Sequence, residues 1–384
     1  MNYIKQHFFG FLIIIFMILS CNNNNEYKLQ QNKKTNKLIK TLIPKYAKGF
    51  KIKYYTNYKK IIVFNPWDNN KIFWQYFIFY GDTILPKNKN SNFYLYNNVN
   101  KTIVLSATQT AMLNKLNLSD KIIAIDDSTY IYNKEIIASV KNGKIKLVGD
   151  VTTINQEKVA QINPDIIFTS GWNKINPSLT KLINLNHNIA FVLEWQENSL
   201  LARAEWIKYI AAFYNTEKFA DSLFSVTEKK YKTLLTKVKN TKTKPLVMQG
   251  SYTANNWYAA GGKSYITNLI NDAKGDYILK TDTNTGSVPV NFEKFFDKAK
   301  IADFWFTTIT KNTVIDKRIK YFKSVKNNNI YTNTNKIDNK GGNDYWETGI
   351  TNPDLILKDF IKILHPEILP DYKLIFYKKA DINF

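Results

Sequence analysis

The chain carries one long helical segment between two regions in which short strand patterns alternate with helix patterns. Residues 216–239 contain no Gly or Pro, and their apolar residues recur at the spacing of a helix. At 1.5 Å per residue such a helix would extend on the order of 35 Å, which is long enough to join two domains. The pattern predicts two α/β lobes, each with a central sheet, connected by one continuous helix.

The region before the long helix predicts a parallel sheet. Short apolar runs favour strands at residues 101–106, 122–125, 165–169 and 190–194. Helical patterns fall between these runs, at residues 108–118, 155–162 and 179–185. Strands that alternate with helices in this way are typical of a parallel α/β domain. Upstream, two segments rich in aromatic and β-branched residues predict two more strands, at residues 51–66 and 72–80.

The alternation resumes after the long helix. Strands are expected at residues 245–249, 303–307 and 329–331, and helices at residues 265–271, 291–298 and 354–364. The predicted organisation is a signal segment (1–21), a flexible tether (22–50), a first lobe (51–212, with a β extension over 51–94), a linker helix (213–242) and a second lobe (243–384).

The beginning of the chain has the pattern of an export signal. A single Lys5 precedes an apolar run over residues 8–19, and the small Ser20 stands directly before Cys21. The apolar run is too short for a stable membrane span. Since Cys21 is the only cysteine, a disulfide within the chain is excluded.

The charge balance is strongly basic, with 54 Lys and Arg against 31 Asp and Glu and a formal net charge of +23. Nucleic-acid recognition relies on Arg forks, whereas here Arg203 and Arg318 are the only arginines and the lysines are dispersed. We therefore expect no nucleic-acid partner, with attraction to anionic lipid headgroups as a secondary effect. The content of 44% hydrophobic and 15% aromatic residues excludes a disordered chain.

Residues 18–21 (ILSC) resemble the lipobox of bacterial lipoproteins. The resemblance implies that the signal is removed and that the mature chain begins at a lipidated Cys21. Several acyl chains on one residue give the stable anchoring that a single chain does not. The alternative is an ordinary secretory signal with a coincidental cysteine. We expect a protein of the cell envelope, lipid-anchored on the periplasmic or extracytoplasmic face of a membrane.

Four blocks resemble the substrate-binding lipoproteins of ABC importers for iron–siderophores, haem and cobalamin. They are residues 106–113 (SATQTAML), the set 149–150, 155–158 and 163–167, residues 197–208 (ENSLLARAEWIK), and residues 341–347 (GGNDYWE) with 364–367 (LHPE). The resemblance covers about residues 62–377. It implies two Rossmann-like lobes, a rigid helix between them and a ligand cleft between the lobes. Many relatives carry His where this chain has Gln109, so ligand chemistry that depends on that His is not expected here.

The resemblance also assigns a docking role to one glutamate on each lobe. Glu157 and Glu293 occupy the positions at which relatives contact arginines of the membrane permease. Two carboxylates fixed on a rigid body bind best to a partner whose cations have matching spacing. The alternative is that both residues only favour helix N-termini.

The ligand site is expected between the lobes, on loops that follow the carboxyl ends of strands. Aromatic faces can pack against a macrocycle or catecholate rings, and an arginine can bind carboxylates. Arg203 has an alternative structural role, as a partner of Glu197 or Glu205. The candidate ligand-binding residues are Gln109, Trp172, Trp195, Arg203, Trp257, Tyr258, Tyr265, Tyr345 and Trp346.

Catalysis has little support in the sequence. After the signal, His187 and His365 are the only histidines, and there is no phosphate-binding Gly loop or Cys/His metal motif. The leading hypothesis is a monomeric, cofactor-free, membrane-tethered binding protein that delivers a ferric-siderophore-type chelate to an ABC permease, with cobalamin or haem as alternative ligands. A periplasmic enzyme and a scaffold lipoprotein without a cleft are the competing classes.

Overall fold

The computed structural model describes residues 36–69, 71–81, 93–96, 99–253, 256–308 and 316–382. Residues 38–384 form one compact unit. The predicted signal, Cys21 and most of the predicted tether lie outside the described residues. Among the residues described, no helix combines the length and the apolar character needed to cross a membrane.

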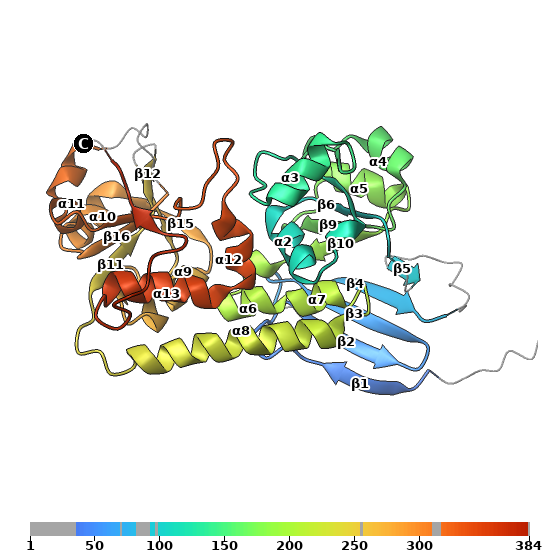
Figure 1. Ribbon diagram of the computed structural model, residues 1–384, viewed down its shortest axis with the longest axis horizontal. Helices are drawn as coiled ribbons and strands as arrows, with labels where there is room; N and C mark the ends of the chain where they lie inside the picture. The colour runs from blue at the N-terminus through green and yellow to red at the C-terminus, as the bar shows by residue number, and fades with distance from the viewer. Residues whose placement is uncertain are drawn as a thin grey trace, which may run out of the picture. The chain divides into compact units, whose positions relative to one another are not determined.

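The first lobe is a parallel sheet with helices between its strands (Figure 1). Strand order is β10-β9-β6-β7-β8. The strands are β6 (Thr102–Val104), β7 (Ile122–Ile125), β8 (Lys146–Leu147), β9 (Ile166–Ser170) and β10 (Ile189–Val192), and the helices are α2 (Ala107–Lys115), α3 (Lys134–Lys141), α4 (Gln156–Ile162) and α5 (Pro177–Asn184). A short 3-10 turn, η1 (Ser119–Lys121), precedes β7. Strand β9 begins Ile166-Ile167-Phe168, all fully buried, because helices cover both faces of a parallel sheet.

The second lobe contains two sheets. The larger has the order β14-β11-β16-β17-β18, parallel except for the edge strand β18. Its strands are β11 (Leu246–Gln249), β14 (Asp276–Tyr277), β16 (Phe304–Thr307), β17 (Ile330–Thr332) and β18 (Lys378–Lys379). A smaller antiparallel sheet consists of β12 (Ser251–Thr253), β13 (Asn256–Ala260) and β15 (Ser287–Asn291). The helical elements are α9 (Tyr265–Asp272), α10 (Phe292–Ala299), η3 (Lys317–Tyr321), α11 (Lys323–Lys326), η4 (Asp344–Trp346), α12 (Thr348–Thr351) and α13 (Pro353–Leu364).

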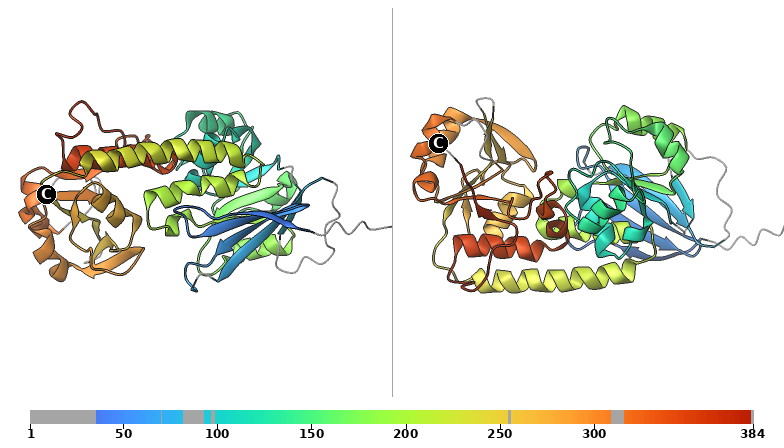
Figure 2. Two further views of the ribbon diagram at one scale, coloured as in Figure 1. Left: turned by 90° about the horizontal axis from the view of Figure 1, so that it is seen from below. Right: turned by 45° about the horizontal axis from the view of Figure 1, so that its top comes forward.

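The long helix α8 (Glu217–Val238) contacts both lobes and runs alongside them (Figures 1 and 2). Near its start, Glu217 binds the buried Lys59 ammonium at 2.7 Å. Near its end, the Tyr231 hydroxyl donates to Asp272 of α9 at 2.8 Å. Three short elements precede it, η2 (Glu194–Gln196), α6 (Leu200–Glu205) and α7 (Ile207–Ala211). The predicted fold class, two α/β lobes joined by one long helix, is confirmed.

A third sheet precedes the first lobe and packs against it. Its strands run in the order β1 (Leu38–Leu42), β2 (Phe50–Tyr55), β3 (Tyr58–Phe64), β4 (Ile72–Phe79) and β5 (Phe93–Tyr96). The Phe50 ring lies 5.0 Å from the Trp206 ring, and the Phe191 N–H of β10 donates to the Tyr76 hydroxyl at 2.8 Å. The prediction of one strand over residues 51–66 is wrong, because this segment is a hairpin of β2 and β3.

The prediction of a flexible tether is wrong for residues 38–50. Strand β1 belongs to the N-terminal sheet, and the segment after it is held by two buried carboxylates, Glu197 and Glu205, which we call the N-terminal clamp. Glu205 accepts the backbone N–H groups of residues 45–47 at 2.7–3.0 Å. Glu197 accepts those of residues 48 and 49 at 2.9–3.1 Å. Hydrogen bonds to backbone N–H groups produce no hydrophobic periodicity, so this attachment has no sequence pattern that would predict it.

Candidate functional site

A pocket of about 440 Å³ lies between the two lobes. Most of its wall comes from loops at the carboxyl ends of the parallel strands β6, β7, β8 and β9, where open α/β sheets place their ligands. The first-lobe lining residues are Leu105, Ser106, Ala107, Thr108, Asp126, Tyr130, Asp150, Val151, Thr169, Ser170 and Trp172. The volume falls in the range of small-molecule sites.

The second lobe closes the pocket with Gly341, Asn343 and Trp346, from the loop between β17 and α12. The Asp338 carboxylate shapes this loop by accepting the N–H groups of Gly341 and Gly342, both at 2.9 Å. Gly341 adopts φ of 112°, a conformation that favours glycine. Asn343 then caps η4 by accepting the Tyr345 N–H at 3.0 Å. The loop is therefore held by local hydrogen bonds where it faces the pocket.

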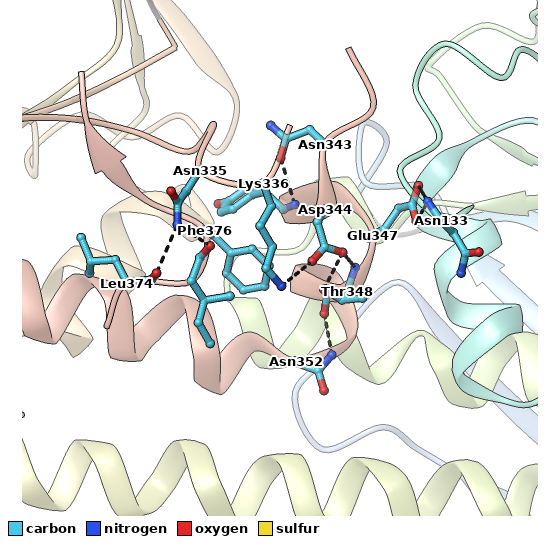
Figure 3. Close-up of polar contacts among 12 residues, drawn as sticks. Asn133, Asn335, Lys336, Asn343, Asp344, Glu347, Thr348, Asn352, Leu374 and Phe376 are labelled. Carbon is cyan, nitrogen blue, oxygen red and sulfur yellow. Dashed lines mark hydrogen bonds and ion pairs between the residues drawn. The ribbon is translucent and has the colours of Figure 1, made fainter. Parts of the chain in front are cut away.

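One buried glutamate ties the lobes together beside the pocket. Glu347, which is 3% exposed, accepts the backbone N–H groups of Tyr132 and Asn133, the second at 3.1 Å. Figure 3 shows Glu347 and Asn133 facing each other from the two lobes. A Cβ on Gly342 would stand 2.3 Å from the carbonyl oxygen of Ile131, so only glycine permits this approach. We call Glu347 and Gly342, with their first-lobe partners, the interlobe clasp.

Burial raises the pKa of Glu347 to about 7, and the nearby Asp344 and Asp338 carboxylates act in the same direction. The backbone N–H groups of Tyr132 and Asn133 lower it in part. Asp344 itself is paired with Lys336 at 3.1 Å and accepts the Thr348 hydroxyl at 2.7 Å, as Figure 3 also shows. The clasp is therefore a carboxylate whose protonation changes near neutral pH.

The aromatic part of the pocket comes from both lobes. The Trp172 ring is 53% exposed and lies 4.6 Å from the ring of Trp195. The Trp346 ring is 37% exposed and meets the Tyr345 ring edge-on at 4.8 Å. Trp172 and Trp346 line the pocket, whereas Trp195 and Tyr345 support them from behind. These four residues are the predicted candidates that the fold brings to the cleft.

Two carboxylates, Asp126 and Asp150, line the pocket, and the charge of Asp127 also acts on Asp126; we call these three residues the acidic corner. Burial raises the pKa of Asp126 to about 6, and the Asp127 and Asp150 charges add to this shift. Hydrogen bonds from Thr152, by its hydroxyl at 2.6 Å and its N–H at 2.7 Å, lower the pKa of Asp150. Asp126 and Asp150 line the pocket, and none of the pocket's lining residues is Lys, Arg or His.

Arg203 lies below the pocket rather than in its wall. Its guanidinium is 3.8 Å from the Glu194 carboxylate and sits over the Tyr265 ring at 4.4 Å, so it connects α6 with α9. Glu194 also accepts the hydroxyl of the lining residue Thr108 at 2.9 Å. The alternative prediction that Arg203 pairs with Glu197 or Glu205 is wrong, because both carboxylates serve the N-terminal clamp. Neither Arg203 nor Tyr265 lines the pocket.

Three further candidates lie away from the pocket. Gln109 is fully buried, and its amide donates to the Phe168 carbonyl at 3.2 Å and accepts the Ser170 N–H at 3.1 Å. Trp257 is fully buried in the second lobe, where its indole N–H donates to the Gln249 carbonyl at 2.9 Å. Tyr258 is exposed on β13. These positions correct the prediction that the three residues bind the ligand, because residue type alone does not show which side chain faces the cleft.

The sequence reasoning missed the polar residues of the pocket. Asp126 and Tyr130 follow β7, and Asp150 follows β8. The rule that ligands bind at the carboxyl ends of strands already pointed to these loops. The predicted site residues were aromatic, basic or amide side chains and included no carboxylate. Among the described residues, no three His, Cys, Asp or Glu side chains are grouped so that they could hold a metal ion.

The two proposed docking glutamates occupy equivalent places in the two lobes. Glu157 is exposed in the first turn of α4, which Asn155 caps, and Glu293 is exposed in the first turn of α10, which Asn291 caps. Glu293 is also bonded to Arg318 at 2.6 Å. Their shared position fits both a docking role and a preference for helix N-termini.

Sequence and structure comparisons agree with this architecture. The model of the periplasmic binding protein family matches residues 103–336. An uncharacterized lipoprotein of Methanocaldococcus jannaschii is 31% identical, over 94% of this chain and 91% of that protein. A possible iron-binding (periplasmic solute-binding) protein of Staphylococcus epidermidis has a TM-score of 0.55 at 19% identity, over 70% of this chain and 99% of that one.

A periplasmic haem-binding protein of Pseudomonas aeruginosa has a TM-score of 0.51 at 12% identity, over 74% of this chain and 99% of that one. At such identities the solved structures show a shared fold. The family match begins at residue 103, after the N-terminal sheet. It covers the first lobe, α8 and much of the second lobe, including most of the pocket wall. The chain belongs to the periplasmic binding protein family, whose members bind solutes rather than transform them.

Proposed function

We propose that this protein captures a bulky metal chelate in the interlobe pocket and delivers it to an ABC permease. A ferric siderophore is the leading ligand, with cobalamin and haem as alternatives. The observation that carries the proposal is the pocket itself, which is lined by Trp172 and Tyr130 of one lobe and by Trp346 of the other. Aromatic rings contributed by both lobes suit a large planar or ring-bearing guest.

A chelate fits the pocket better than a bare ion does. The described residues hold no metal-ligating cluster, so a metal would have to arrive with its own ligands. Proteins of the same fold include the possible iron-binding protein, the haem-binding protein and a Helicobacter pylori protein crystallised with Ni(II). We infer that the first lobe, α8 and the second lobe work as one monomeric receptor.

Delivery is proposed to use Glu157 and Glu293, one exposed carboxylate on each lobe. A permease that binds Glu293 would have to replace its pairing with Arg318. The Glu157→Arg and Glu293→Arg double variant should bind ligand normally but fail to support uptake by the reconstituted transporter. Normal uptake by that variant would exclude docking through these residues.

Tethering is proposed to use Cys21. The lipobox-like residues 18–21 support this proposal, and two of the similar Methanocaldococcus jannaschii proteins are described as lipoproteins. Such an anchor would place the binding domain on an extracytoplasmic surface. The Cys21→Ser variant should then leave the membrane fraction, and its retention there would contradict lipid anchoring at this residue.

Ligand titration tests the binding function directly. Native mass spectrometry with ferric siderophores, cobalamin and haem should detect at least one complex with one ligand per chain. The Trp172→Ala variant should weaken that complex about tenfold, since one aromatic wall is lost. Tyr321→Ala, which removes an exposed ring of η3 outside the pocket lining, is the matched control and should bind normally. Failure of every chelate to bind would overturn the proposal.

A further inference from the structure

We propose that the pocket selects uncharged or cationic chelates over anionic ones, and that Asp126 and Asp150 impose this selection. The inference rests on the proposed function and narrows its ligand class. The charge of the pocket wall is opposite in sign to that of the whole chain. The chain as a whole carries a net charge of +23, yet the charged side chains in the pocket wall are two carboxylates.

The acidic corner has no cationic partner among the described residues. Within the described part of the chain, Asp126, Asp127 and Asp150 form no ion pair with Lys, Arg or His. Asp150 accepts its hydrogen bonds from Thr152 and Thr153, which hold it in the ionised form. Its negative charge therefore remains available to a guest.

Two basic residues close to the cleft have partners of their own. Arg203 lies beneath the pocket against Glu194 and Tyr265, and Lys336 is paired with Asp344. A ligand that brings carboxylates or an anionic metal centre would find no arginine or lysine on the pocket wall. Like charges brought together in a partly desolvated site repel strongly.

The aromatic residues of the pocket also favour a guest without negative charge, for a separate reason. Trp172, Trp346 and Tyr130 line the pocket. Aromatic rings attract cations through their electron-rich faces. Hydroxyls of Ser106, Thr108 and Ser170 can accept hydrogen bonds from amide or ammonium groups of a guest. Aromatic faces next to carboxylates form a site for a guest with N–H donors and no net negative charge.

This chemistry ranks the possible chelates. Ferric tricatecholates are strongly anionic, and haem carries two carboxylates, so both lack a partner in the pocket. Hydroxamate chelates of ferric iron are neutral or cationic, and corrinoids carry many amide groups. The structure therefore favours the last two classes.

A matched series of ligands tests the inference. The probes are a linear ferric trihydroxamate with a terminal ammonium, its N-acetyl derivative, which is neutral, and its N-succinyl derivative, which is anionic. Affinity should follow the order cationic, neutral, anionic, with the ends of the series differing about tenfold at low salt. Added salt should reduce the difference, since exposed charges are screened.

A charge-neutralised variant identifies the residues responsible. In the double variant Asp126→Asn and Asp150→Asn, the difference in affinity between the cationic and the anionic derivative should fall to about threefold or less. Asparagine at position 150 still accepts the Thr152 N–H, so the loop is preserved. The control is the double variant Asp297→Asn and Asp371→Asn, which removes the same charge from exposed sites of the second lobe. It should keep the full difference in affinity between the two derivatives.

The outcomes separate the two proposals. Equal or tighter binding of the anionic derivative would overturn the selection while leaving the binding function intact. If trihydroxamates do not bind but a corrinoid does, the same comparison is made between cobalamin and a derivative with one amide hydrolysed to a carboxylate. Tight binding of that carboxylate would also overturn the selection. If no chelate of any charge binds, both proposals fail.

Discussion

The N-terminal clamp and the acidic corner use the same functional group in opposite ways. Glu197 and Glu205 are buried, and backbone N–H groups of residues 45–49 surround their oxygens. Asp126 is also largely buried, but its neighbours include Asp127 and Asp150, and it faces an open pocket. A structural carboxylate is satisfied within the protein, whereas a carboxylate kept for a ligand is left incompletely paired at some cost in stability.

The largest expected loss of stability comes from a substitution in the N-terminal clamp. Glu205→Ala removes the acceptor of three backbone N–H groups and the partner of Lys208, which lies 3.1 Å away. Leaving buried donors unpaired should lower the free energy of unfolding by about 3 kcal/mol, measured by urea denaturation. Glu135→Ala, at an exposed position in α3, should change it by less than about 0.5 kcal/mol. Equal stability of the two variants would mean that the clamp does not hold the N-terminal segment.

An intermediate effect is expected at the interlobe clasp, where Glu347 has features of both regions. It accepts backbone N–H groups as the clamp does, yet burial raises its pKa to about 7, above the ordinary value near 4.5. Between pH 4.5 and about 7, the unfolded chain has lost the Glu347 proton while the folded protein still holds it. The contribution of Glu347 to the free energy of unfolding therefore falls as the pH rises from 4.5 to about 7.

The variant Glu347→Gln should lack that pH dependence. Relative to it, the wild-type free energy of unfolding should fall by roughly 2 kcal/mol between pH 4.5 and 8, a value reduced to allow for partial solvation. Melting curves across this range measure the difference. Parallel pH profiles for the two proteins would show that the clasp carboxylate does not titrate as its burial implies.

The smallest expected effect is on the acidic corner, and its sign is opposite to that of the clamp. Burial raises the pKa of Asp126 to about 6, so the ionised form destabilises the fold as pH rises from about 4 to 6. Asp126→Asn should therefore be neutral or stabilising by about 1 kcal/mol at pH 8, and closer to wild type at pH 4.

The same denaturation measurement compares it with Asp371→Asn, at an exposed position of the second lobe. This control should leave the free energy of unfolding unchanged at both pH values. A large loss of stability in Asp126→Asn would place Asp126 with the clamp residues and remove the contrast on which the ligand selection depends.

Local patterns determined most of the fold. The helix predicted over residues 216–239 is α8 (Glu217–Val238), because a long amphipathic run without Gly or Pro has one favourable conformation. Four strands of the first lobe, β6, β7, β9 and β10, were predicted because buried parallel strands are short and continuously apolar. The exposed two-residue strand β8 was not predicted. Helix α3 (Lys134–Lys141) was not predicted, although Ile136, Ile137 and Val140 recur along it at helical spacing.

The candidate site was predicted only in part. Its position at the carboxyl ends of strands follows from the topology of parallel sheets, and Trp172 and Trp346 were among the residues proposed for it. Gln109 and Trp257 share the residue types of a binding site but satisfy their polar groups inside a lobe. Sequence alone does not distinguish an aromatic ring that packs in a core from one that faces a cleft.

Local sequence patterns and the single cysteine were enough to predict the two lobes, the connecting helix, the absence of an internal disulfide and the loops that carry the pocket. The roles of the carboxylates became evident only in the folded chain. Glu205 meets Tyr46 across 159 residues of chain, and Glu347 meets Tyr132 across 215. Helix and strand patterns arise from neighbours a few residues apart. The role of a charged group depends instead on which donors the completed fold brings to it, and these come from distant parts of the chain.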